Sequence, residues 1–86
     1  MYSVEFKSQA AKSIRTLPKN IQKRILKKIE ALQQDPFPHN SQRLHEHPNL
    51  YKIRYSSYRV VYHVEPDKTH IIITKIGHRR DVYNSL

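Results

Sequence analysis

A set of basic side chains in the second half of the 86-residue chain could act together on a phosphate group. Lysine and arginine supply positive charge to a phosphorane transition state. Histidine, or a lysine surrounded by other cations, can also move protons. The residues that we expect on or beside one surface are Lys52, Arg54, Arg59, His63, Lys75, His78, Arg79, Arg80 and Tyr83.

This set fits RNA cleavage without a metal ion. In that reaction a 2′-hydroxyl attacks the adjacent phosphate, which requires a base, positive charge and an acid for the leaving 5′-oxygen. Tyr83 offers a ring on which a base can stack, or a phenol for hydrogen bonding. The same cations could instead only hold a polyanion, without catalysis. The residues leave both readings open.

A metal-dependent reaction is not expected from the acidic residues. A catalytic metal ion needs carboxylates to hold it. The four acidic residues after position 40 are scattered over predicted turns: Glu46, Glu65, Asp67 and Asp81. His45 and His47 have ligand-like spacing, but no nearby cysteine or acidic cluster completes a site. We therefore predict neither a metal nor another cofactor.

The stretch from Leu50 to Val64 must position the central cations. Its alternation places Tyr51, Ile53 and Tyr55 on one face of a strand and Lys52 and Arg54 on the other. A turn at Ser56-Ser57 would then set Arg54 opposite Arg59. Like charges directly opposite each other destabilise a sheet by roughly 0.2–1 kcal/mol per pair. This arrangement favours a negatively charged ligand for the hairpin.

The remaining chain supplies one strand and two helices before the hairpin and one strand after it. We expect Ser8 to cap the first helix, Pro18 to separate the two helices, and Gly77 to end the last strand. The fold class is α+β, with an antiparallel-rich four-stranded sheet and a helical hairpin on one face. The open face would carry Lys52, Arg54 and Arg59. The expected elements are a strand over residues 2–6, helices over 8–17 and about 19–34, strands within 50–64, and a strand over 69–76.

Composition narrows the class of protein further. The chain has 16 Lys and Arg against 7 Asp and Glu, a net charge of +9, which is typical of a protein that binds a polyanion such as nucleic acid. It has no cysteine, so disulfides are excluded. No apolar run reaches the roughly 20 residues of a membrane span, and the start lacks a signal peptide. We expect a single cytoplasmic domain over residues 1–86, without membrane contact.

Several short motifs occur together and in one order over nearly the whole chain. With these motifs the chain resembles the RelE family of bacterial and archaeal toxins, within the larger RelE/ParE superfamily. Each motif alone is weak, but their order and spacing together are specific. The motifs are Tyr2–Phe6, Ala10–Lys12, Leu17-Pro18, Tyr51–Arg54, Tyr58–Tyr62, Ile76–Arg79 and Val82-Tyr83.

The resemblance implies a RelE-like fold and a toxin of a type II toxin–antitoxin system. Such a toxin enters the ribosomal A site and cuts the exposed mRNA codon without a metal. The family pattern implies that Lys52 is a general base or phosphate contact, and that Arg59 stabilises the transition state. Arg54 stands where close relatives often have lysine, so a phosphate contact remains but a base role does not. Arg79 would be the general acid or stabilise the leaving group, and Tyr83 would stack on the mRNA base.

Some positions depart from the family pattern. The pair Arg79-Arg80 lies close to Tyr83, so Arg80 could take the role of Arg79. Little chain follows Tyr83, which predicts that the terminal helix of some relatives is absent. His63 and His78 are possible acid–base residues, and Lys75 and Arg80 are expected RNA contacts. The general base stays open between Lys52, His63 and a substrate-assisted route.

The resemblance also implies partners. A cognate RelB-like antitoxin, acidic in its binding segment, would cover the basic face, and promoter DNA would be bound only through it. The other partners would be the ribosome and mRNA. Two alternatives remain: a ParE-like toxin that inhibits DNA gyrase without nuclease activity, and a degenerate module that only binds the antitoxin. The combination of Lys52, Arg54, Arg59, Arg79 and Tyr83 favours the nuclease.

Overall fold

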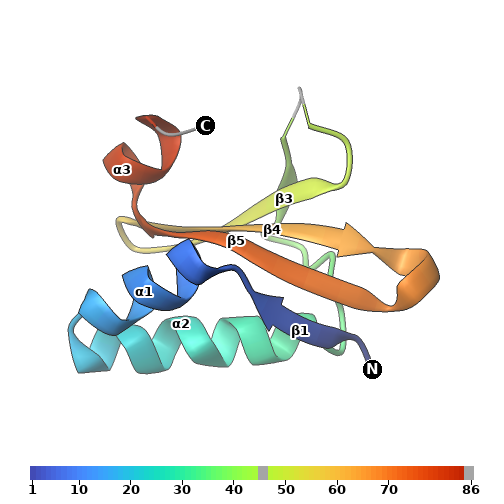
Figure 1. The fold of residues 1–86 in the computed structure, drawn as a ribbon, viewed down its shortest axis with the longest axis horizontal. Coiled ribbons are helices and arrows are strands. Elements are labelled where there is room, and N and C mark those ends of the chain that lie inside the picture. Colours follow the sequence, from blue (N-terminus) through green and yellow to red (C-terminus); the bar gives the residue numbers. More distant parts are fainter. Residues whose placement is uncertain (45–46, 85–86) are drawn as a thin grey trace.

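Alternating apolar and polar residues build a five-stranded sheet through the centre of the molecule (Figure 1). The computed structural model describes residues 1–44 and 47–84, apart from the side chains of Asp81, Tyr83 and Asn84. The strand order is β1-β5-β4-β3-β2. β1 runs parallel to β5, and the other neighbouring strands are antiparallel. The strands are β1 (Ser3–Phe6), β2 (Gln42–Arg43), β3 (Leu50–Tyr55), β4 (Tyr58–Glu65) and β5 (His70–His78).

Two amphipathic helices cover one face of this sheet (Figure 1). They are α1 (Ser8–Thr16) and α2 (Lys19–Leu32), separated by Pro18, whose extended backbone precedes the first turn of α2. Apolar residues spaced by three or four positions place one stripe of each helix in the core. The buried residues are Ala10 and Ile14 in α1 and Ile25, Ile29 and Leu32 in α2.

The core lies between these helices and the inward face of β3, β4 and β5. Its strand residues are Ile53, Val60, Tyr62, Val64, Ile71, Ile73 and Ile76. Tyr62 is fully buried, and its hydroxyl donates a hydrogen bond of 2.8 Å to the carbonyl oxygen of Pro36. This bond ties the loop after α2 to the centre of the sheet. Burial raises the pKa of Tyr62 to about 12, because the phenolate would lose its hydration.

This buried phenol predicts a loss of stability at alkaline pH. The folded-state pKa lies above the ordinary 10.0, so the stabilisation is complete below pH 10 and is lost as pH rises toward 12. The loss should reach about 2–3 kcal/mol. At pH 10 the free energy of unfolding of Tyr62→Phe should be about 0.5–1.5 kcal/mol lower than that of wild type, because the hydrogen bond to Pro36 is gone. Between pH 10 and 12 it should then decrease less than that of wild type, because phenylalanine does not ionise. Urea unfolding at both pH values measures this difference, with half-buried Tyr55→Phe as the control. Equal alkaline losses in wild type and Tyr62→Phe would contradict it.

The first strand is fastened to β5 by side chains as well as by the backbone. The hydroxyl of Ser3 lies 2.6 Å from Nδ1 of His70, and Nε2 of the same ring lies 2.9 Å from Oε1 of Glu5. Ser3 and His70 are also register partners in the parallel pair. The three polar groups therefore hold β1, which lies at one edge of the sheet.

The α+β class and the helix-covered sheet are confirmed, but four details differ from expectation. The sheet gains a strand, because β2 pairs with β3 through Gln42 and Lys52. Ser8 begins α1 and does not cap it; Lys7 is the N-cap residue. Gly77 does not end β5, which continues to His78. The chain also forms a C-terminal helix, α3 (Arg79–Asn84), so the prediction of a missing terminal helix is wrong.

The helix α3 lies on the opposite side of the sheet from α1 and α2 (Figure 1). Val82 in α3 is buried, and a Cβ placed on Gly77 would meet Val82 Cγ2 at 3.5 Å, an ordinary contact distance. The outward face of the sheet is thus covered at one end and not left fully open. Among the described residues, no helix combines the length and hydrophobicity needed to cross a bilayer.

Candidate functional site

The β3–β4 hairpin has the predicted register. Tyr55 pairs with Tyr58, Ile53 with Val60 and Tyr51 with Tyr62, so the apolar members face the helices. Arg54 stands directly opposite Arg59 on the outward face. The two-residue turn uses Ser56 in the left-handed region, at φ 55°. The like-charged pair predicted from the sequence is therefore confirmed.

Arg59 is held in place by the turn of its own hairpin. Its Nη1 donates hydrogen bonds to the carbonyl oxygens of Ser56 at 3.1 Å and Tyr58 at 2.9 Å. A guanidinium carries five N–H groups, so these two bonds leave other donors for a ligand. Because the group is anchored by backbone carbonyls, less side-chain freedom is lost when it contacts a phosphate.

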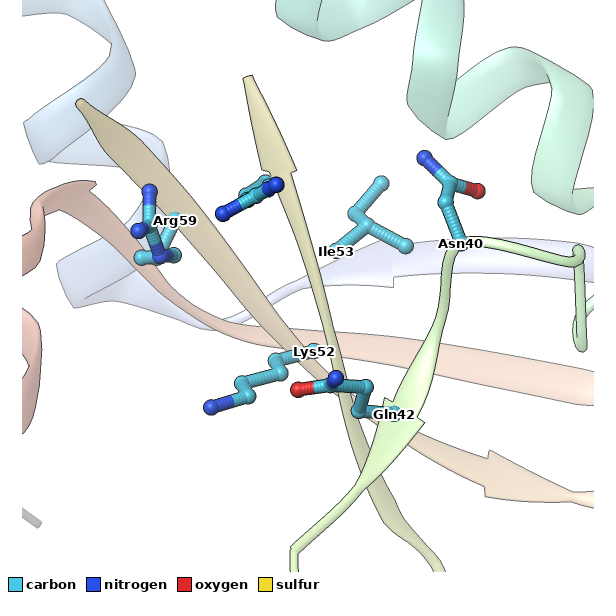
Figure 2. Close-up of a pocket in the computed structure, with 6 residues that line it drawn as sticks. Asn40, Gln42, Lys52, Ile53 and Arg59 are labelled. Atoms are coloured by element: carbon cyan, nitrogen blue, oxygen red, sulfur yellow. The ribbon is translucent and has the colours of Figure 1, made fainter. Parts of the chain in front are cut away.

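A pocket of about 300 Å³ opens beside the hairpin, where β2 approaches β3 (Figure 2). Figure 2 shows Lys52 and Arg59 on neighbouring strands, with Gln42 reaching toward Lys52 from β2. The lining residues are Asn40, Gln42, Lys52, Ile53, Arg54 and Arg59. Among the described residues, the lining of the pocket therefore combines three cations with two amides and includes no carboxylate. We call it the basic pocket.

Lys75 reaches the same face of the sheet because of a β-bulge. The β4–β5 register shifts between Val61 and Tyr62, so Lys75 pairs with Val61 while Ile73 pairs with Tyr62. Thr74 is the extra residue, and its hydroxyl donates to the carbonyl oxygen of Val61 at 3.0 Å. Without the bulge, strict alternation would put Lys75 on the core side with Ile73. Lys75 thus lies in the outward row with Val61 and Lys52 but does not line the basic pocket.

Arg79 and Arg80 lie at the start of α3, beside the hairpin turn. The N–H of Arg79 donates to the carbonyl oxygen of Ser57 at 2.8 Å, which fixes the end of β5 next to the turn that holds Arg59. Both arginines are exposed, and neither lines the basic pocket. Tyr83 lies in α3, but its side chain falls outside the described part of the structure. The roles that the resemblance implies for Arg79, Arg80 and Tyr83 therefore stay predictions.

The two candidate histidines lie in different places. His78 pairs with Tyr58 and packs edge-on against its ring, with centroids 6.0 Å apart, so it faces away from Arg54 and Arg59. His63 lies on the outward face but lines a second hollow, near Leu50 and Ile72. Neither imidazole lines the basic pocket. Within residues 1–44 and 47–84, no three acidic, histidine or cysteine side chains are grouped as metal ligands.

Comparison with known proteins assigns a family to this arrangement. A family model described as the ParE toxin of the type II toxin-antitoxin system parDE matches residues 4–83. A candidate toxin RelE1 of Methanocaldococcus jannaschii is 31% identical over 98% of this chain and 97% of its own. The chain belongs to the RelE/ParE family of toxins.

Solved structures of RelE toxins share the fold. The archaeal RelE–RelB complex from Pyrococcus horikoshii is similar with a TM-score of 0.81 and 30% identity, over 91% of this chain and 94% of that one. The isolated Escherichia coli RelE toxin gives a TM-score of 0.82 and 25% identity over 100% of both chains. The chain is therefore a RelE-like toxin of a type II toxin–antitoxin system.

Two residues of the toxin's basic pocket were not predicted from the sequence. Asn40 and Gln42 lie between the second predicted helix and the hairpin, where we predicted no strand. The two-residue strand β2 brings them to the pocket by pairing Gln42 with Lys52. Such a short strand has too few residues to show alternation, so no periodic signal marks it. Their amides can donate hydrogen bonds to phosphate or base oxygens.

The opposed arginines of this toxin predict a conflict between stability and RNA binding. Arg54→Gln removes one charge of the pair and should raise the free energy of unfolding by about 0.2–1 kcal/mol. It should also weaken the binding of a polyanion such as RNA and lower its dependence on salt, because one cation of the basic pocket is lost. Urea unfolding and RNA titration at two salt concentrations measure both effects. Exposed Arg43→Gln on β2 removes a charge outside the opposed pair and is the matched control. A less stable Arg54→Gln protein would contradict the expected strain.

Proposed function

We propose that this toxin is a ribosome-dependent mRNA endonuclease that cuts the codon in the A site without a metal. The observation that carries the proposal is the convergence of Lys52, Arg54 and Arg59 in one pocket, whose described lining residues include no carboxylate. Such a pocket attracts a phosphate and stabilises added negative charge on it. The resemblance to RelE toxins supports ribosome-bound mRNA as the proposed substrate.

The charges suit attack by a neighbouring hydroxyl. The 2′-oxygen bonds to phosphorus as its proton leaves, and the bond from phosphorus to the 5′-oxygen then breaks as that oxygen gains a proton. The products are a 2′,3′-cyclic phosphate and a 5′-hydroxyl. Arg59, anchored on the turn, would stabilise the phosphorane, and Arg54 would hold a second oxygen. Both roles need charge and position, and neither needs a proton transfer.

The proton transfers fall to other groups. Lys52 lines the basic pocket and is the general base that we favour, since His63 lies one row further along the sheet. Arg79 begins α3 beside the hairpin turn, where it would donate the proton that the departing 5′-oxygen gains, or stabilise that oxygen by its charge while water supplies the proton. Arg80 is its neighbour and can replace it in this role. Tyr83 would stack on the base of the codon, and Lys75 would add a phosphate contact.

An acidic antitoxin is the expected partner of the free toxin. The RelE of Pyrococcus horikoshii was solved in complex with RelB. The net charge of +9 on this chain would attract an acidic segment, which could cover the basic pocket and exclude mRNA. Promoter DNA would be bound through the antitoxin. This arrangement makes release from the antitoxin the step that starts cleavage.

Mapping of mRNA ends in cells tests the proposed activity. After induction of the toxin, primer extension should show new 5′ ends inside translated codons and none in untranslated regions. Arg79→Ala should lose most of these ends at equal protein level, whereas Arg15→Ala, an exposed arginine of α1, should keep them. Ends spread equally over untranslated RNA would contradict the dependence on the ribosome. An absence of new ends would contradict cleavage itself.

A second candidate function follows from the ParE description of the matching family model. A ParE-like toxin would inhibit DNA gyrase and cleave nothing itself. Purified toxin would then block supercoiling of plasmid DNA by gyrase, and cells would accumulate DNA breaks with intact mRNA. The concentration of cations in the basic pocket favours the nuclease, because binding to gyrase does not require that arrangement.

A further inference from the structure

A second hollow lies on the same outward face of the sheet as the basic pocket. Its volume is about 460 Å³, within the usual range of small-molecule sites. The residues that line it include Lys7, His47, Pro48, Leu50, His63 and Ile72. It shares no lining residue with the basic pocket. The mechanism above leaves it without a role.

The strand register gives the position of this hollow relative to the basic pocket. Three rows cross the outward face: Arg54 with Arg59, then Lys52 with Val61, then Leu50 with His63. Ile72 on β5 extends the third row. Successive residues on one face of an antiparallel strand lie about 7 Å apart. The hollow thus begins one row beyond Lys52. This is about the separation of neighbouring nucleotides in one bound RNA chain.

The lining of the hollow differs in kind from that of the basic pocket. Leu50, Ile72 and Pro48 supply apolar surface, and His63 adds a flat ring with polar nitrogens. Leu50, His63 and Ile72 are each only partly buried. Contiguous apolar surface with a polar rim, here Lys7, His47 and His63, can mark a ligand-binding groove. A nucleobase has the same two properties, a flat apolar face and polar edges, and histidine rings are among its stacking partners.

We propose that this hollow binds the base of a nucleotide next to the scissile phosphate. The inference rests on the proposed function, since it takes the basic pocket as the place of the phosphate. Lys52, in the row between, would border the backbone that joins the two nucleotides. Lys7 at the hollow would add a cation near the same strand. The imidazole nitrogens of His63 could then form hydrogen bonds with the polar edge of some bases and not of others. This makes His63 a determinant of the codon preference.

Binding of a short oligonucleotide that cannot be cut tests the inference directly. The probe is a 2′-deoxy trinucleotide, which lacks the attacking hydroxyl, compared with analogues that are abasic at either end. Base stacking contributes 1–3 kcal/mol per base. Removal of one particular end base should therefore weaken binding by about 5- to 150-fold. It should also abolish the chemical-shift changes that the complete trinucleotide causes at His63 and Ile72. Equal affinity and equal shifts with all analogues would overturn the inference.

Two substitutions separate this inference from the proposed function. His63→Ala and Ile72→Ser should remove the difference in affinity between the trinucleotide and its abasic analogue. Both variants should also change the codon preference of cleavage. Circular dichroism checks that they are folded. His39→Ala, at an exposed position outside the sheet, is the matched control. Unchanged preference in both variants, with cleavage intact, would overturn the inference alone. Base-dependent binding without any cleavage of ribosome-bound mRNA would overturn the proposed function and keep the hollow as a nucleotide site.

The same NMR experiment distinguishes a peptide ligand. An acidic antitoxin segment could also place an apolar side chain between Leu50 and Ile72. If the shifts at His63 and Ile72 follow a synthetic antitoxin segment and never a base, the hollow is a peptide site and the proposal is wrong. If the antitoxin segment displaces a bound trinucleotide that itself requires the end base, the proposal holds.

Discussion

Replacing Arg59 with alanine is expected to slow cleavage of ribosome-bound mRNA by about 10²- to 10³-fold, the usual loss when one preorganised donor to a developing oxyanion is removed. Arg59 lines the basic pocket and is anchored by the carbonyl oxygens of Ser56 and Tyr58. The anchored group would meet the phosphorane without reorganising. Single-turnover cleavage of a programmed ribosome complex measures the effect on the chemical step.

Two further variants separate the charge of Arg59 from its geometry. Arg59→Lys keeps the charge but loses the fork of donors, so its rate should fall between those of wild type and Arg59→Ala. Arg43→Ala removes an exposed arginine of β2 that does not line the pocket and should cut at nearly the wild-type rate. An Arg59→Ala protein that is folded and cuts as fast as Arg43→Ala would contradict the role assigned to Arg59.

Replacing Ile73 with alanine is expected to cost about 2–5 kcal/mol of folding free energy. Ile73 is fully buried on β5, where it pairs with Phe6 of β1 and Tyr62 of β4. The truncated side chain would leave a cavity between the sheet and the helices. Domains of this kind are stable by only about 5–15 kcal/mol, so a large fraction of the stability would be lost. The urea midpoint should fall by about 1–3 M.

The neighbouring isoleucine is a matched control for this effect. Ile72 lies on the outward face, is only partly buried and borders the second hollow. Ile72→Ala removes the same atoms from a site that already contacts solvent, so it should cost less than half as much. Equal urea midpoints for the two variants would show that β5 does not separate a core face from an outward face. That result would also contradict the placement of the basic pocket and the second hollow on one outward face of the sheet.

The hairpin was predictable because its alternation is long and regular. Each of its predicted partner pairs, including Arg54 with Arg59, has the register that was derived from the turn at Ser56-Ser57. A shift by one residue would have moved Ile53 and Val60 out of the core, so the hydrophobic pattern specifies the register strongly. This part of the basic pocket could be read from the sequence alone.

The rest of the site depends on features without a periodic signal. The bulge at Thr74 reverses the alternation of β5 and places Ile76 in the core and Lys75 outside. The short strand β2 brings Gln42 to Lys52, and β5 continues through Gly77 to turn His78 toward Tyr58. Each feature is set by tertiary pairing, which a single strand's pattern does not contain. The second hollow belongs to this class too, because Leu50, His63 and Ile72 come from three strands.

A programmed ribosome complex with a modified A-site codon tests whether the toxin cuts mRNA by attack of the 2′-hydroxyl. One mRNA carries ribose throughout the codon, and a second carries a single 2′-deoxy nucleotide at the position of the cut. We expect purified toxin to cut the first mRNA, leaving a 2′,3′-cyclic phosphate, and to leave the second intact at that position. A cut of equal rate in the 2′-deoxy codon, or no cut in either mRNA, would contradict this expectation.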